Sequence, residues 1–364
     1  TITISATMPT ITNDVSISGT NSATGNPVTI QVTTPGTSTF RVFEINATGE
    51  SVTFTDMTIR GGDVSGASAN GGCILLTDGD LFLTRVTLSD GVANRGGGLS
   101  AASGTLNITD STVSNCSADD TGAALRMDGI DSLTMTGCTI EGNTSANRAA
   151  ALLCYSTPAT ISNCTFEGNT TTNASPFGNI FLDRTGPVTF SNCTIAGNSC
   201  PDSASSAGGI HVYSSSVTFR NCILANNTNQ SGGSDYYYQT GTVTDGGYNI
   251  VEYSNVAANA TGGLDATTSI LYNTKYAQAG TAFTAWSQNG SDLANQNLNL
   301  AGALADNGGS TQTLALGTGS LAIEAIPYAA GTNTWNNSPM SGGNYYDQRE
   351  VETTPSNPIS IGAY

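Results

Sequence analysis

Four cysteines recur in the middle of the chain, at spacings that place them at one point of a repeated unit. They are Cys138, Cys164, Cys193 and Cys222, separated by 26, 29 and 29 residues. Stacked one strand apart, neighbouring Cα atoms would lie about 4.8 Å from each other, within reach of a disulfide. Parallel stacking points all four side chains the same way, however, and a buried thiol packs as a small apolar group. We therefore expect a ladder of free thiols, with a disulfide as the alternative. A metal site is disfavoured because its ligands converge from different directions.

A column of asparagines accompanies the cysteines. Asn143, Asn169, Asn198 and Asn227 each follow a column cysteine by five residues. Asparagine accepts left-handed turn geometry and bonds to neighbouring backbone groups, so we expect a ladder of stacked amides at a bend. Cys73, beside a turn, and Cys200, in a variable segment, are better placed for redox chemistry. The sequence leaves the disulfide state of these two open.

A repeated unit positions both columns. Its phrase reads Ser-Asn-Cys-Thr-Phe-Glu-Gly-Asn at residues 162–169, with related copies at 136–143, 191–198 and 220–227. Fainter copies lie around Met57, Val86 and Ser111. A period of roughly 20 to 50 residues is typical of solenoids. Alternating apolar and polar residues within each unit indicate short strands with one buried face.

The repeats predict an all-β fold: a right-handed parallel β-helix with three strands in each coil of about 27 residues. We expect the solenoid over residues 1–252. Residues 253–364, where the repeat fades, are expected to form an irregular region that packs on it or caps it. The alignment gives four inward columns: Phe54, Leu83, Ile108, Met135, Ile161, Phe190 and Phe219; Ile59, Leu88, Val113, Ile140, Phe166, Ile195 and Leu224; Ile74, Leu99, Leu125, Leu152, Ile180 and Ile210; and Leu76, Ala101, Met127, Cys154, Leu182 and Val212.

The outward positions of the third strand form a stripe that differs from an ordinary solvated face. On successive coils it carries Arg126 and Asp128, Leu153 and Tyr155, Phe181 and Asp183, and His211 and Tyr213. Exposed apolar residues with a polar rim mark contact sites, and aromatic rings beside acids suit a sugar chain or a protein partner. The alternative is that the C-terminal region folds back and covers the stripe.

Composition limits the partners. The 364 residues hold 10 Lys and Arg against 27 Asp and Glu, a net charge of −17. Nucleic acids and anionic membranes need a basic patch, so neither is expected as a partner. No apolar run approaches the length of a membrane span. This composition favours an extracellular or bacterial cell-surface location, and we expect the export signal to have been removed before Thr1.

Catalytic residues are sparse. β-Helix lyases use a Lys or Arg base, and β-helix hydrolases use convergent carboxylates. The chain has one lysine, Lys275, and one histidine, and its acids are scattered. We expect no enzymatic activity, no cofactor and no metal. A polysaccharide lyase or hydrolase is the alternative, and a groove of convergent acids and arginines on one face would distinguish it.

Several phrases resemble known bacterial surface proteins. Gly-Gly-Cys-Ile at 71–74, Gly-Gly-Ile at 208–210 and Phe-Glu-Gly-Asn at 166–169 resemble the repeats of chlamydial polymorphic outer-membrane proteins. The C-terminal part resembles the choice-of-anchor Q β-helix proteins through four segments in order: Asp-Asn-Gly-Gly-Ser-Thr-Gln-Thr at 306–313, Gly-Ser-Leu-Ala-Ile at 319–323, Asp-Gln-Arg at 347–349 and Ile-Gly-Ala-Tyr at 361–364. The resemblance implies a secreted or surface-displayed right-handed β-helix and brings no catalytic motif.

Together these features favour a non-enzymatic structural protein of the cell surface or extracellular space. We expect a solenoid stalk or fibre-forming subunit with adhesive capacity, whose partners are further copies of itself or other surface proteins and glycans. Residues 1–4 and 359–361 look like strands at the ends of the solenoid, and open strand edges favour head-to-tail assembly into filaments. A glycan-binding adhesin that uses Tyr155, Phe181 and Tyr213 is the alternative of a different class.

Overall fold

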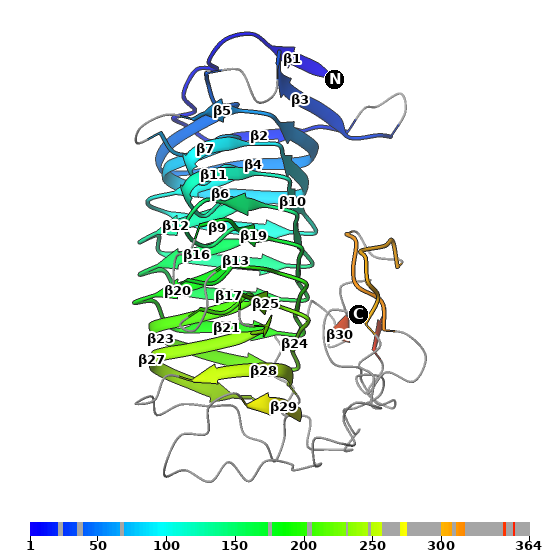
Figure 1. Ribbon diagram of the computed structural model, residues 1–364. Helices are drawn as coiled ribbons and strands as arrows, with labels where there is room; N and C mark the ends of the chain where they lie inside the picture. The colour runs from blue at the N-terminus through cyan, green and yellow to red at the C-terminus, as the bar shows by residue number, and fades with distance from the viewer. Residues whose placement is uncertain are drawn as a thin grey trace.

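The computed structural model describes residues 1–20, 25–34, 39–65, 69–173, 177–201, 206–230, 232–246, 249–256, 270–274, 300–307, 311–316, 345–346 and 352–353. All regular structure in these segments is β-strand. Coils of parallel strands stack along one axis, from β1 (Ile2–Ile4) at one end of the column to β29 (Ile270–Thr274) at the other (Figure 1). None of the described segments contains a helix that could cross a membrane.

Each coil contributes strands to three main stacks. The first stack contains β2 (Val15–Ser18), β9 (Thr105–Thr109), β13 (Ser132–Thr136), β17 (Ala159–Ser162) and β21 (Val188–Ser191). The second contains β1, β3 (Val28–Val32), β10 (Thr112–Ser114), β14 (Thr139–Glu141), β18 (Thr165–Glu167), β22 (Thr194–Ala196), β24 (Ile223–Ala225), β28 (Ile250–Val256) and β29. The third contains β8 (Leu99–Ala101), β12 (Leu125–Asp128), β16 (Leu152–Tyr155), β20 (Ile180–Asp183) and the start of β27 (Tyr236–Asp245). Three long strands, β4 (Phe43–Arg60), β6 (Ile74–Ser89) and β23 (Ile210–Arg220), run through bends and so belong to more than one stack.

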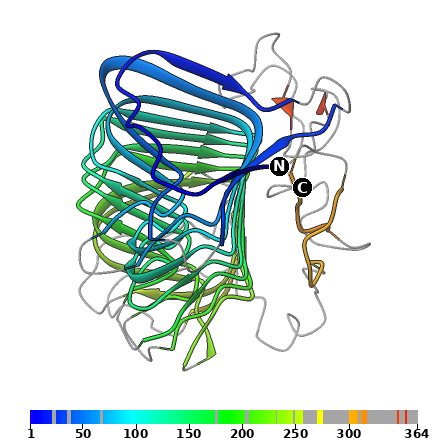
Figure 2. The same ribbon diagram turned by 90° about the horizontal axis from the view of Figure 1, so that it is seen from above.

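The register confirms all four inward columns. In the first, Phe54 pairs with Leu83, and the pairing continues through Ile108, Met135, Ile161, Phe190 and Phe219. The other three columns are in register in the same way. Their members are buried in one continuous apolar core, where each large side chain contributes roughly 1.5–3 kcal/mol of burial energy. Viewed down the axis, like strands of successive coils lie over one another (Figure 2). The prediction of a parallel β-solenoid is therefore confirmed.

A fourth, short strand adds to the three that were predicted. It follows the column asparagine and forms a separate parallel sheet of β5 (Asp63–Val64), β7 (Val92–Arg95), β11 (Ser117–Thr121), β15 (Thr144–Ser145) and β19 (Thr170–Thr171). These strands are two to five residues long, too short for the alternation of side chains to be visible in the sequence.

The three bends of each central coil share a two-residue pattern. A residue with left-handed backbone geometry comes first, and a small polar residue follows it. The left-handed residues include Asn163, Asn192 and Asn221 at the first bend, Gly142, Gly168 and Gly197 at the second, and Ser156, Arg184 and Ser214 at the third. The small polar residues that follow them include Cys164, Cys193 and Cys222, Asn143, Asn169 and Asn198, and Thr157, Thr185 and Ser215.

At each bend, the amide of the polar residue donates to a side chain of the next coil. Cys138 N donates to Cys164 Sγ at 3.4 Å and Thr157 N to Thr185 Oγ1 at 3.0 Å, while Asn169 N makes the equivalent bond to the next asparagine. Backbone donors left unpaired in a protein interior are costly. The three side-chain ladders therefore stabilise turns that the strand pairing leaves incomplete.

Part of the C-terminal region packs on the side of the column. Residues 300–307 and 311–316 form an antiparallel pair, with bridges between Leu300 and Leu316 and between Ala305 and Thr313. Thr139 Oγ1 donates to Gln312 O at 2.6 Å, and Thr311 Oγ1 donates to the Gly137 carbonyl at 2.9 Å. This segment therefore lies beside β14 on the second stack.

Parallel pairing also extends past the expected end of the solenoid. β28 pairs with β29 through Ile250 and Ile270. The remaining described strands are two short pairs: β25 (Thr228–Asn229) with β26 (Gly232–Gly233), and β30 (Tyr345–Tyr346) with β31 (Glu352–Thr353). Whether residue 252 is a domain boundary stays a prediction. The predicted closing strand at 359–364 lies outside the described residues.

Candidate functional site

The stripe predicted on the third stack separates into two outward columns. Register places Arg126, Leu153, Phe181 and His211 in one column, which continues to Tyr237. The other column contains Asp128, Tyr155, Asp183 and Tyr213. We call them the inner and outer columns of the stripe. The predicted stacking of these eight residues is therefore present, but the two columns have different surroundings.

The inner column is buried. Leu153 is 8% exposed, Phe181 2% and His211 0%. Phe177, just before β20, lies against it, with its ring 4.4 Å from that of Phe181 and 5.4 Å from that of His211. The Arg148 guanidinium lies 4.2 Å from the Phe177 ring centre, a cation–π arrangement. Phe181 and His211 are therefore packing residues under a local cover, and Phe181 is not available to a ligand.

The cover comes from a different part of the chain than the sequence suggested. The C-terminal region was expected to fold back over the stripe, yet its described segment 311–316 contacts Thr139 and Gly137 on the second stack. Phe177 and Arg148 lie in bend segments next to the third stack. The sequence did not identify either residue, because both lie in variable segments that fall outside the repeat.

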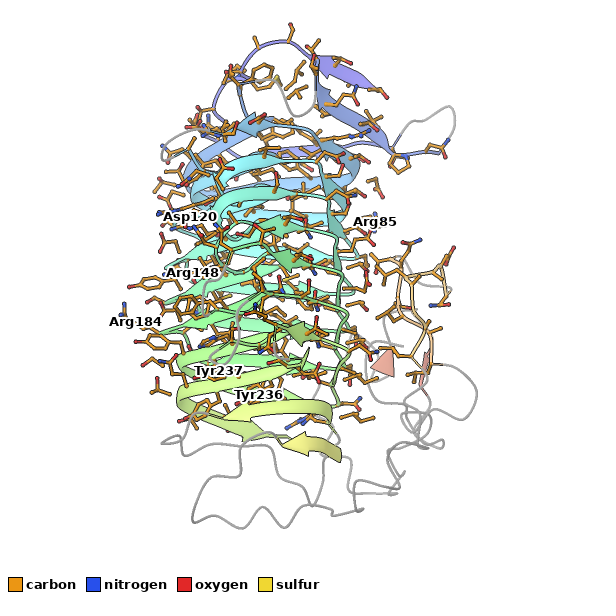
Figure 3. The ribbon with its side chains drawn as sticks, in the orientation of Figure 1. Arg85, Asp120, Arg148, Arg184, Tyr236 and Tyr237 are labelled. Carbon is orange, nitrogen blue, oxygen red and sulfur yellow. The ribbon has the colours of Figure 1, made fainter. Side chains whose placement is uncertain are left out.

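The outer column is partly exposed, and an arginine that the alignment of repeats did not identify lies beside it. Arg184 follows β20, and its side chain is 58% exposed. Its Nη1 donates to the Tyr155 hydroxyl at 2.9 Å, and its guanidinium carbon lies 5.7 Å from the Tyr155 ring centre. Figure 3 shows Arg184 and Arg148 on the same side of the column, with Arg85 on the other. Arg184 stands directly before Thr185 in the third bend, where the alignment of apolar positions gives no signal.

Asp183 lies beneath this arginine. Its carboxylate is 16% exposed, and the nearest contact to Arg184 Nε is 3.8 Å, too long for a hydrogen bond. Burial raises the pKa of Asp183, while Arg184 and Arg148 act in the opposite direction. None of the described residues donates a hydrogen bond to its Oδ1. Asp128, one position along the column from Tyr155, is instead bonded to Arg126 at 2.6 Å.

Other acids of the solenoid are paired with arginines one coil away. The Asp56–Arg85, Asp90–Arg60 and Asp120–Arg95 pairs have contacts of 2.6, 2.6 and 2.8 Å. Hydrogen bonding to Arg85 lowers the pKa of Asp56. Among the described residues, no three His, Cys, Asp or Glu side chains gather into a possible metal site. These ion pairs link neighbouring coils.

Two glutamates on the second stack are not paired in this way. Glu141 and Glu167 are in register on the outward face of β14 and β18, and neither forms an ion pair among the described residues. Burial raises the pKa of both carboxyl groups, and the charge of Glu141 further raises that of Glu167. They lie directly after inward-column residues of neighbouring repeats, so the sequence alignment already placed them together.

Replacing Glu167 by glutamine should stabilise the fold at neutral pH. Because the pKa of Glu167 is raised in the folded protein, its ionised form destabilises the fold. The free energy of unfolding therefore falls as the pH rises through the folded-state pKa, and glutamine avoids this loss. We expect a gain of roughly 0.5 kcal/mol at pH 7 that disappears below about pH 4. Urea unfolding at both pH values measures it, with Glu44→Gln, whose carboxylate pairs with Arg41, as the control expected to lose stability. An equal gain at both pH values would contradict the electrostatic explanation.

The cysteine column is a ladder of buried free thiols. All eight cysteines of the chain are buried and free. Within the column, each sulfur donates to the carbonyl two residues earlier, at 3.3 Å for Cys138, 3.1 Å for Cys164, 3.3 Å for Cys193 and 3.2 Å for Cys222. The thiols therefore act as small polar bend residues as well as apolar packing. Cys73 and Cys200, predicted as the redox candidates, are equally buried.

Thiol reagents test this arrangement. Burial raises the pKa of Cys154 to about 12 and also raises that of Cys164, so the reactive thiolate is scarce at these two positions, and burial makes all eight thiols inaccessible to a reagent. We expect none of the eight cysteines to react with Ellman's reagent in the native protein and all eight to react in guanidinium chloride. Fewer than eight in denaturant would reveal a disulfide, and rapid native labelling would contradict the burial.

The asparagine column forms a chain of side-chain hydrogen bonds from one coil to the next. Asn143 Nδ2 donates to Asn169 Oδ1 at 2.9 Å, Asn169 to Asn198 at 2.9 Å, and Asn198 to Asn227 at 2.8 Å. Asn227 Nδ2 in turn donates to the buried carboxylate of Asp235 at 2.7 Å. The ladder provides hydrogen-bond partners for backbone groups at the bends.

Comparisons with known proteins support the fold. The family model described as right handed beta helix region matches residues 42–201. No curated protein and no solved structure matches the chain. The likeness to chlamydial and choice-of-anchor Q proteins stays a resemblance. The family match over these residues and the stacked parallel strands together support a right-handed parallel β-helix fold.

Proposed function

We propose that this chain is a non-enzymatic structural protein: a solenoid stalk or fibre-forming subunit with adhesive capacity. The observation that carries the proposal is the set of side-chain ladders, which tie each central coil to the next at all three bends. Asn198 alone donates to Phe166 O at 3.0 Å and to Ala196 O at 3.1 Å, besides its bond to Asn227. Such bonding along the axis suits a rod that must resist bending.

The polar chemistry of the described surface supports the same proposal. Its arginines neutralise acids across coils, as Arg95 does with Asp120. This use of charge links neighbouring coils and so stabilises a column. The acidic composition supports an extracellular or cell-surface location, because it disfavours nucleic acid and anionic membranes as partners. Protease accessibility on intact cells would test that location.

Association of copies along the axis would extend the rod. Ile2 and Met8, on the first coil, are 55% and 36% exposed, unusually high for large apolar side chains. A contact that repeats head to tail without closing produces a filament. End-to-end stacking is therefore the mode of self-association that we propose.

Negative-stain electron microscopy at several protein concentrations tests the proposal. Straight filaments built from column-shaped subunits would support a fibre-forming role. Dispersed short rods would support a stalk and exclude filament formation under those conditions. Flexible or globular particles would overturn the structural role itself. The variant Ile2→Asp is expected to abolish filaments while leaving single rods intact, with Phe82→Asp, which changes another exposed apolar residue, as the control.

A polysaccharide hydrolase is the second candidate, and the Glu141–Glu167 pair favours it. Retaining glycosidases use two carboxyl groups about 5–5.5 Å apart, and in-register residues on neighbouring strands are spaced at about 4.8 Å. A raised carboxyl pKa also suits a general acid. Release of reducing sugar from polysaccharides that is lost in both Glu141→Gln and Glu167→Gln would establish it. Activity unchanged by these variants would reject the pair as its site.

A further inference from the structure

We propose that Tyr155, Asp183, Arg184 and Tyr213 form a binding strip for a neutral β-linked polysaccharide chain that runs along the solenoid axis. We call these four residues the tyrosine–arginine strip. The inference rests on the proposed role as a surface solenoid with adhesive capacity, since it names what the adhesive face would bind. Phe181, in the inner column, is not part of the strip because it is buried.

The spacing of the strip fits a two-sugar repeat. Tyr155 and Tyr213 are in the same outward column with Asp183 between them, so they are two coils apart. At about 4.8 Å per coil, the two rings are roughly 10 Å apart along the axis. An extended β-1,4-linked chain repeats every two sugars at a closely similar length. Every second sugar could therefore lie on an aromatic side chain.

The polar groups between the rings match sugar hydroxyls. The Arg184 side chain is 58% exposed, and its Nε lies 3.8 Å from the buried Oδ1 of Asp183. A guanidinium has five N–H donors, so it can donate to the hydroxyl oxygens of a sugar as well as to Tyr155, whereas an apolar ligand has no acceptor for these bonds. Asp183 contributes to the strip through its contact with the guanidinium rather than through a bond to the ligand.

The bend fixes the arginine in place. Arg184 has φ of 50°, in the left-handed region that a long side chain rarely adopts. The equivalent residues of the neighbouring coils are Ser156 and Ser214, which suit the bend without projecting far from it. Arg184 also donates to the Tyr155 hydroxyl at 2.9 Å, and its guanidinium carbon lies 5.7 Å from the centre of that ring, so the two side chains hold each other in place. Pre-ordered groups of this kind lose little entropy on binding.

Charge selects a neutral chain over an acidic one. The whole protein carries a net charge of −17, and the strip itself holds one acid and one base. Asp128, next to Tyr155 in the same column, adds a carboxylate at one end. A polyanion would be repelled by this field, while a neutral chain would be unaffected.

Affinity electrophoresis of the full chain tests the proposal, because it detects weak binding. Native gels would contain hydroxyethyl cellulose as the neutral polymer or carboxymethyl cellulose as an acidic polymer of the same backbone. We expect retardation in the neutral gel, about tenfold weaker apparent affinity in Arg184→Gln and in Tyr213→Ala, and no change in Arg85→Gln. Arg85 is a matched control: it is 53% exposed, has φ of 52° and lies on the other side of the column (Figure 3).

Three outcomes would overturn the inference. They are the absence of retardation in the neutral gel, stronger retardation by the acidic polymer, and equal retardation of the wild type and both strip variants. Arg184→Gln changes an exposed side chain, so it guards against a folding defect in Tyr213→Ala, and thermal unfolding of each variant confirms folding. The proposed structural role fails separately: rods or filaments seen by microscopy without binding would reject the strip alone.

Discussion

Replacing Asn169 by alanine should lower the free energy of unfolding by roughly 3–5 kcal/mol. The Asn169 side chain donates to the Ile140 and Glu167 carbonyls at 2.9 and 3.1 Å, and its Oδ1 accepts from both the backbone amide and the Nδ2 of Asn143. All of this lies in a site with no solvent exposure. Truncation therefore leaves several buried groups unpaired in the middle of the column. Urea unfolding followed by circular dichroism measures the loss.

Asn173→Ala is the matched control for this experiment. Asn173 also bonds to an asparagine one coil away, donating to Asn147 Oδ1 at 3.1 Å, but on the exposed surface. Its removal should cost less than about 0.5 kcal/mol, because water replaces the lost bond. In a solenoid each coil contacts only its neighbours, so a central defect can also split the transition into two steps. If Asn169→Ala and Asn173→Ala unfold at the same urea concentration, the ladder contributes no more than a surface contact.

The inward face of the fold could be predicted from the sequence because two periodicities coincide. Alternation with period two identifies buried positions within a strand, and the repeat aligns those positions between coils. Leu83, Ile108 and Met135 were placed in one column on this basis, and their register confirms it. The same alignment found the asparagine ladder, since a buried asparagine at a bend has few roles other than bonding to backbone groups.

The outward face could be predicted only in part. The repeat placed Tyr155 and Asp183 side by side, but it could not show that Phe177 and Arg148 cover the inner column. Those two residues lie in bend segments, whose conformation depends on local contacts and has no period. Arg184 was missed for a related reason: it lies between strands, where an alignment of apolar positions carries no information.

The ladder at the third bend was missed for a different reason. It contains Thr157, Thr185 and Ser215, and the Thr185 hydroxyl bonds to the Thr157 carbonyl. Threonine and serine are abundant throughout this chain. A column made of them does not stand out, whereas cysteine and asparagine in identical roles do.

Replacing Gly97 by alanine should cost more than about 3 kcal/mol or prevent folding. A methyl group at this position would meet the backbone oxygens of Ser117 at 2.3 Å, Gly91 at 2.6 Å and Ala123 at 2.9 Å. Gly97 belongs to the run of glycines just before β8, the same place in the coil as the Gly-Gly phrases elsewhere in the repeat. Two coils and the short-strand sheet approach one another there too closely for any side chain. The yield of folded protein and its thermal midpoint measure the effect.

Gly302→Ala separates this clash from the general cost of replacing glycine. None of the described residues lies within 4 Å of the position that its methyl group would occupy, so the stability of the variant should change by less than about 0.5 kcal/mol. Because the three atoms facing Gly97 are all backbone, no side-chain rotation can relieve the contact. The neighbouring coils would have to separate at this point, breaking backbone bonds such as that from Gly98 N to Ala123 O at 2.9 Å. A Gly97→Ala protein with wild-type stability would mean that this junction is looser than its backbone geometry requires, and that the glycines have another reason for their place in the repeat.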